Sequence, residues 1–280
     1  DTATLLIKHG ANVNRSLKKN HMSPLMMAAF RGDNAMIELL LDSKADIEHV
    51  NSGGVNALIT AIDKRHPDSA TLLLKRGAKV KSVSSFGNSA LHYAVSADDV
   101  TLVRELVAKK AQVNATNMYG LTPAMHASAG GKVAALEALI DAGADINLIG
   151  GPSEGTALIV AAGNNRVEAV NLLIRKGASI NARDKLGATA LIWAAGRQQV
   201  DAVRALLAGK ADTNIQDNAG RTALMLAADR GNQAIVDLLL EHGADMEIKD
   251  NAGQTAMDYA VKKGNKVVFP EPPGGEGNTG

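Results

Sequence analysis

The chain has 280 residues, a net charge of +1 at pH 7 and no cysteine. The near-zero charge argues against attraction of the whole chain to nucleic acid or a membrane surface. The missing cysteine excludes disulfides, thiolate nucleophiles and cysteine-ligated zinc. Hydrophobic residues make up 46% of the chain but aromatic residues only 2%, which favours thin, closely packed helices built from Ala, Leu, Val and Ile.

The start of the sequence and its apolar runs do not fix the compartment of the protein. The sequence opens at Asp1, without an initiator Met or a signal peptide, so we expect a fragment or a processed form. No apolar run approaches the roughly 18 residues of a membrane-spanning helix. We expect a soluble intracellular protein without direct membrane insertion, in the cytoplasm or, after processing, inside an organelle.

One short segment recurs eight times along the chain, 33 residues apart except for one step of 34. Thr or Ser opens most copies and fits an N-cap, and the small residues that follow predict a short helix that neighbours can approach closely. In chain order the copies read SPLMMAA (23–29), NALITAI (56–62), SALHYAV (89–95), TPAMHAS (122–128), TALIVAA (156–162), TALIWAA (189–195), TALMLAA (222–228) and TAMDYAV (255–261).

A second helix is predicted between these segments, with apolar residues on one face, as in Val170, Leu173 and Ile174. It ends at a residue expected to be left-handed, which is Gly177 in that copy. Three copies place Lys at this position, namely Lys44, Lys110 and Lys210. A left-handed residue other than Gly costs on the order of 1 kcal/mol, so those copies are expected to be locally weaker.

This pattern resembles the ankyrin repeat, whose unit is a β-hairpin turn followed by two antiparallel helices with a T-P-L-H-x-A signature. The resemblance covers about residues 1–264 and implies an all-α solenoid of helix-turn-helix repeats with short β-hairpin turns. Its expected divisions are a partial repeat at 1–14, seven ankyrin repeats at 15–247, a partial repeat at 248–264 and a Pro/Gly-rich tail at 265–280. The sequence departs from the signature, since only His92 keeps the His and only two copies keep the Pro.

The stretch "LIGGPSEGTAL", residues 148–158, has glycines spaced as in a phosphate-binding loop. It lacks the Lys that follows the second Gly in such a loop. It also stands where another copy reads "ARDKLGATAL", with one residue more. We therefore interpret it as a lengthened hairpin.

The C-terminal end departs from the repeat pattern after residue 264. Pro270 prevents a normal second helix there. We expect Val267, Val268 and Phe269 to fold back over the last repeat near Met257, Tyr259 and Ala260 as an improvised cap. The composition of 271–280 is typical of disorder, and we expect order there only in a complex.

Nothing in the sequence combines into a catalytic site. The seven histidines lie in different repeats, and no nucleophile–base pair, paired carboxylates or metal motif is found. The resemblance gives His92 a structural role. We expect no enzyme activity, no cofactor and no metal, and instead binding of another protein through hairpin tips and the concave helix face that the family uses.

Three sets of side chains are candidates for that contact. Phe86 and Tyr119, 33 residues apart before the turn Gly, are expected on neighbouring hairpin tips with Met118 and Leu121 beside them, either as an anchor patch or as hairpin packing. Tyr93 and Trp193 share a slot that borders the groove, either as a seam between repeats or as a partner contact. A slot two residues after the Ala-Ala pair is basic near both ends, including Arg31, Arg197 and Arg230. The full candidate set is Phe86, Tyr119, Met118, Leu121, Tyr93, Trp193, Arg197, Arg230, Phe30 and Arg31.

The basic slot has two interpretations. It is either a solvated face, diluted by Asp63 and Asp229, or the rim of a groove that takes an apolar segment in its middle and acidic groups at its ends. The function predicted is protein–protein recognition without nucleic-acid binding. An alternative is a structural subunit packed into a larger multiprotein assembly through its ends and tail.

Overall fold

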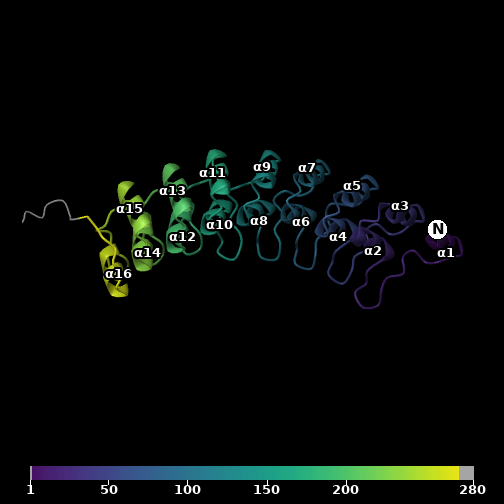
Figure 1. Cartoon of the computed structure of the whole chain (residues 1–280), viewed down its shortest axis with the longest axis horizontal. Helices are drawn as coiled ribbons and strands as arrows, with labels where there is room; N and C mark the ends of the chain where they lie inside the picture. The colour runs from purple at the N-terminus through teal and green to yellow at the C-terminus, as the bar shows by residue number, and fades with distance from the viewer. Residues whose placement is uncertain (1, 271–280) are drawn as a thin grey trace, which may run out of the picture. The chain divides into compact units, whose positions relative to one another are not determined.

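The computed structural model describes residues 2–270, and within them it is helical with short loops (Figure 1). The chain divides into two compact units, residues 1–157 and 158–280. The helices of the described residues are α1 (Thr2–Lys8), α2 (Pro24–Arg31), α3 (Asn34–Asp42), α4 (Ala57–Asp63), α5 (Pro67–Lys75), α6 (Ala90–Ala97), α7 (Val100–Ala108), α8 (Pro123–Gly130), α9 (Val133–Asp141), α10 (Ala157–Gly163), α11 (Val167–Arg175), α12 (Ala190–Gly196), α13 (Val200–Ala208), α14 (Ala223–Arg230), α15 (Gln233–Glu241) and α16 (Ala256–Lys263).

Within each unit the helices form two layers. In the first unit α2, α4, α6 and α8 pack side by side, and α3, α5, α7 and α9 form a second row next to them, above them in the view of Figure 1. In the second unit α12, α14 and α16 pack in the same way, as do α11, α13 and α15. The core consists of small and branched aliphatic side chains such as Leu73, Leu106, Leu136, Ala194 and Ala227, all fully buried. The all-α repeat fold predicted from the sequence is confirmed.

The first helix of a repeat begins at a capping side chain. Thr122 is the N-cap of α8, where its hydroxyl accepts a hydrogen bond from the Met125 N–H, and Pro123 occupies the first turn. Pro fits there because the first-turn N–H groups have no partner within the helix. The same cap bond is made by Ser23, Asn56, Thr189, Thr222 and Thr255.

The second helices end as the sequence predicts. Gly77, Gly143 and Gly177 have positive φ angles after α5, α9 and α11. Lys44, Lys110 and Lys210 have φ angles of 64°, 62° and 65°, so the prediction that these lysines are left-handed is confirmed. The residue before Lys210 is Gly209. A Cβ at residue 209 would lie 2.9 Å from the side-chain ends of both Ile174 and Ile180.

Neighbouring hairpins are joined by single backbone hydrogen bonds. In the first unit the Ser85 N–H donates to the Gly53 carbonyl oxygen over 2.7 Å, and the Met118 N–H donates to the Phe86 carbonyl oxygen over 2.9 Å. The donors, Ser85 and Met118, lie one residue before the tip residues Phe86 and Tyr119 of their own hairpins. The acceptors, Gly53 and Phe86, are the tip residues of the preceding hairpins. Isolated β-bridges occur at Val83–Ser89 and Gly150–Gly155. These bonds align the tips of successive repeats on one side of the first helices (Figure 1).

The loop at 148–158 is a hairpin. Gly150 and Gly155 exchange two backbone hydrogen bonds of 3.0 and 2.9 Å, which confirms the interpretation as a lengthened hairpin. The Gly151 N–H donates to the Gly120 carbonyl oxygen over 2.9 Å, so the lengthened hairpin is still bonded to the preceding hairpin. A Cβ on Gly150 would overlap that same carbonyl oxygen. Glycine is therefore required at residue 150 by close backbone approach.

The start of the tail corrects one prediction. The Val268 backbone exchanges two hydrogen bonds, of 2.8 and 3.0 Å, with the Gln233 side chain at the start of α15. Its own side chain is 71% exposed, so the expected apolar cap is wrong for Val268. Just before it, the Asn265 side chain donates hydrogen bonds to the Ala228 and Asp229 carbonyl oxygens at the end of α14. The prediction for residues 271–280 lies outside the described residues.

Candidate functional site

The first unit carries a cluster of exposed rings on adjacent hairpin tips. Phe86 and Tyr119 are each 52% exposed, and Met118 is 62% exposed. The hydrogen bond from Met118 to Phe86 joins their two hairpins directly, and the Asn117 and Asn88 side chains add a second bond of 2.9 Å. The spacing of 33 residues therefore places the two rings on neighbouring tips, as expected. We call Phe86, Met118 and Tyr119 the fingertip patch.

The hairpins under this patch are held by their own backbones. The Asn117 side-chain oxygen accepts hydrogen bonds of 3.0 Å from the Tyr119 and Leu121 N–H groups, which closes the turn. Leu121 is half-buried, and its carbonyl oxygen accepts a bond of 3.0 Å from Nε2 of His92. Leu121 thus contributes to the framework of the hairpin, while Met118 and Tyr119 project from it.

A second exposed apolar row was missed by the sequence reasoning. The row lies on the hairpins, one residue before Ser84, Asn117 and their equivalents in the other repeats. Its most exposed member is Ile149, which is 65% exposed. Successive side chains of an extended segment point to opposite faces. Because Ser84 and Asn117 are buried toward their own repeats, the preceding side chains face away from them. The 33-residue spacing was the signal that would have found the row, whose apolar members are Leu17, Val50, Val83 and Ile149, with the polar Thr116 between the last two.

Trp193 and Tyr93, the predicted slot residues, are both half-buried. Nε1 of Trp193 donates a 2.7 Å hydrogen bond to Asp184, and the Arg197 guanidinium carbon lies 4.7 Å from the Trp193 ring centroid. Tyr259 repeats the first contact through its hydroxyl, which donates to Asp250 over 2.7 Å. Burial and that hydrogen bond raise the pKa of Tyr259 to about 12. These two bonds tie Trp193 and Tyr259 to the hairpins of their own repeats.

The basic slot is neutralised to different degrees. Lys64 pairs with Asp63 over 2.8 Å and also lies 5.2 Å from the centroid of the exposed Phe30 ring. Arg230 and Lys263 share one carboxylate, that of Asp229, at 3.9 and 3.8 Å. The dilution by Asp63 and Asp229 expected from the sequence is thus present.

Two further slot residues line hollows of the surface. Arg31 borders a small hollow of about 220 Å³ with Phe30, Met27, Met22 and Leu17. Arg197 makes no ion pair among the described residues, and its Nη1 donates a 3.0 Å bond to the Gly163 carbonyl oxygen. It borders a hollow of about 300 Å³ between α12 and α14, together with Trp193, Leu226, Arg221 and Arg230.

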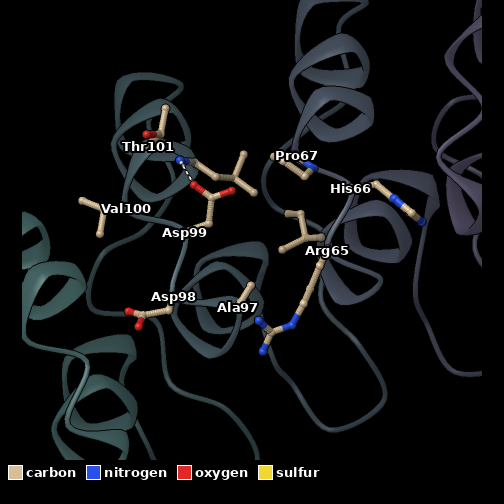
Figure 2. Close-up of a pocket in the computed structure, with 10 residues that line it drawn as sticks. Arg65, His66, Pro67, Ala97, Asp98, Asp99, Val100 and Thr101 are labelled. Atoms are coloured by element: carbon tan, nitrogen blue, oxygen red, sulfur yellow. Dashed lines mark hydrogen bonds between the residues drawn. The ribbon is translucent and has the colours of Figure 1, made fainter.

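Titratable groups gather at a third hollow without forming a catalytic arrangement. This cavity of about 430 Å³ lies between the turn before α5 and the turn before α7. Figure 2 shows His66 directed away from Asp98 and Asp99. The two aspartates and the histidine already have structural partners: Asp99 caps α7 at the Leu102 N–H, Asp98 pairs with Lys132, and His66 bonds the Phe30 carbonyl oxygen. No group of side chains in the described part of the chain is suited to hold a metal ion.

The family model described as "Ankyrin repeats (3 copies)" matches four overlapping stretches that together span nearly the whole chain, 1–84, 77–150, 148–217 and 199–269. The chain belongs to the ankyrin repeat family. No curated protein matches the sequence. Ankyrin repeats are in general protein–protein interaction modules and are typically not catalytic. None of the helices in the described range 2–270 has the length and apolar character needed to cross a membrane.

The signature histidine of this ankyrin repeat chain is a structural group. His92 is buried, and because its Nε2 donates to the Leu121 carbonyl oxygen, its Nδ1 must be the acceptor for the Ser89 N–H at 3.2 Å. The His126 ring meets it edge-on at 6.1 Å. Burial lowers the pKa of both histidines. His92 therefore links its helix to the hairpin below Tyr119.

Proposed function

We propose that this ankyrin repeat chain is a non-catalytic recognition module that binds a partner protein through the hairpin tips of its first unit and the adjoining side of its first helices. The observation that supports this most is the fingertip patch. Large rings are rare in this chain, yet two of them stand half exposed on adjacent hairpins. Aromatic side chains on a rigid support are the residues most often found at the energetic centre of protein interfaces.

The support for the patch is rigid without the rings. Backbone bonds and the Asn117 side chain hold the hairpins, and the helices below have their own aliphatic core. Removal of the rings is therefore expected to leave the fold intact. The apolar row from Leu17 to Ile149 adds further exposed surface on the same hairpins.

The interpretation as a structural subunit has less support. It rests on the ends of the chain, and the described start of the tail is bound to the chain itself through Gln233. A specific observation in favour of that interpretation would be a cross-link from the tail to another subunit in native material.

The test is a double variant, Phe86→Ala/Tyr119→Ala, measured against a partner identified by cross-linking mass spectrometry from native material. Burying a whole ring contributes roughly 1.5–3 kcal/mol, and about half of each ring is still available, so the two together contribute about 1.5–3 kcal/mol. Binding is expected to weaken at least tenfold, which needs about 1.4 kcal/mol.

The matched control is Val261→Ala, because Val261 is an exposed apolar side chain on helix α16 of the second unit and is not part of a hairpin. It is expected to leave partner binding unchanged. A double variant that melts well below the wild type would show that the rings are hairpin packing. One that folds and binds at full affinity would refute the proposal.

A further inference from the structure

The second unit contains a built hollow between α12 and α14 that the fingertip patch does not use. Its floor is apolar, formed by Ala188 and Ile192, both nearly fully buried, and by Leu226. Gly196 keeps the floor open, since a Cβ there would lie 3.1 Å from the Leu226 side chain. Leu186, which is half exposed, stands at the rim. The volume of about 300 Å³ suits one apolar side chain with the backbone next to it.

One wall of the hollow is fixed before any ligand arrives. Trp193 is anchored by its bond to Asp184, and the Arg197 guanidinium lies over its ring while bonded to the Gly163 carbonyl oxygen. No carboxylate among the described residues pairs with Arg197. A preorganised, unneutralised guanidinium beside an aromatic face is suited to receive a carboxylate.

The other charges of the lining leave a positive excess. Arg221 forms a two-pronged bond to Asp217, with its Nε and Nη2 at 2.9 and 2.7 Å, and this interaction raises the pKa of Arg221. Asp217 is therefore already neutralised. Arg230 must share Asp229 with Lys263. Arg197 and Arg230 thus remain beside an apolar floor as groups that can meet negative charge.

We infer that this hollow binds an acidic segment of a partner protein, with one apolar side chain on the floor and neighbouring carboxylates on Arg197 and Arg230. The inference rests on the proposed function and adds a separate site and the chemistry of its ligand. A polyanion such as nucleic acid fits less well, because only Arg197 and Arg230 remain to meet negative charge and a continuous row of phosphates needs more cations.

The corresponding position in the first unit lacks these features and serves as the control. The hollow beside Tyr93 is lined by Asp63 and Arg65, and Ala97 stands where Arg197 stands in the second unit. Lys64 is already paired with Asp63. Substitution of Lys64 or Arg31 therefore changes the same slot without changing the proposed site.

The experiment uses the full chain and labelled twelve-residue Gly/Ser peptides that carry one leucine and two glutamates, at several spacings. Trp193 is the only tryptophan, so its emission reports directly on the hollow. At least one spacing is expected to bind, to shift Trp193 emission and to weaken as salt is added. Replacement of both glutamates by glutamine should lower the affinity at least tenfold, equivalent to about 1.4 kcal/mol.

Variants decide where the peptide binds. Arg197→Gln and Arg230→Gln should each reduce the affinity by about tenfold, whereas Arg31→Gln and Lys64→Gln should leave it unchanged, with circular dichroism confirming that all four fold. Equal binding of glutamate and glutamine peptides, or no binding at any spacing, would overturn the inference. A single-stranded oligothymidylate that shifts Trp193 more strongly than the peptide would also overturn it and assign the hollow to nucleic acid. The fingertip double variant should bind the peptide normally, so failure here is distinguishable from failure of the proposed function.

Discussion

Two adjacent lysines at the end of α7 should respond in opposite ways to the same substitution. Lys109 has φ −82° and Lys110 has φ 62°. Both side chains are exposed, so neither substitution removes a buried contact. Lys110→Gly is expected to stabilise the fold and Lys109→Gly to destabilise it.

The magnitudes follow from the two backbone conformations. A left-handed residue with a Cβ costs about 1–2 kcal/mol, which glycine relieves at residue 110. Glycine also gains freedom in the unfolded chain, which lowers stability by about 0.4–1 kcal/mol at either site. The net change in the free energy of unfolding is therefore a gain of a few tenths to about 1 kcal/mol for Lys110→Gly. For Lys109→Gly it is a loss of about 0.4–1 kcal/mol.

Urea denaturation followed by circular dichroism measures both changes, and hydrogen exchange in α7 shows whether they are local. Lys44→Gly and Lys210→Gly should behave like Lys110→Gly, since their φ angles are 64° and 65°. Changes of the same sign at residues 109 and 110 would refute the reasoning, because only the sign of φ distinguishes the two sites.

Two further predictions concern stability. Gly150→Ala should destabilise the first unit by about 1–3 kcal/mol through overlap with the Gly120 carbonyl oxygen, whereas Gly130→Ala, whose added Cβ meets only the flexible Lys132 side chain, should not; equal thermal midpoints for the two would contradict the close approach. The folded-state pKa values of His92 and His126 are lowered, so the unfolded chain takes up protons first and stability should fall as the pH drops below about 6.5. A denaturation midpoint that stays constant from neutral pH into this range, or a decline that persists in a His92→Gln/His126→Gln variant, would argue against that cause.

The repeat, the helix caps and the left-handed lysines follow from the sequence alone. They are local: Thr122 reaches the N–H of Met125 three residues away, and the position of Lys110 after a helix sets its φ angle. A recurrence of such local signals at 33-residue spacing determines the fold class. The same spacing placed Phe86 and Tyr119 on neighbouring tips, because equivalent residues of successive repeats stack.

Tertiary structure decided what the repeat period does not encode. Trp193 is held by Asp184 of its own hairpin and covered by Arg197, whereas Ala97 stands at the equivalent position in the hollow beside Tyr93. The start of the tail attaches to Gln233 through the Val268 backbone and to the end of α14 through Asn265, and the Val268 side chain stays exposed. These contacts join residues in different elements, and their side chains vary from repeat to repeat. Their partners are therefore set by packing in space and not by distance along the chain.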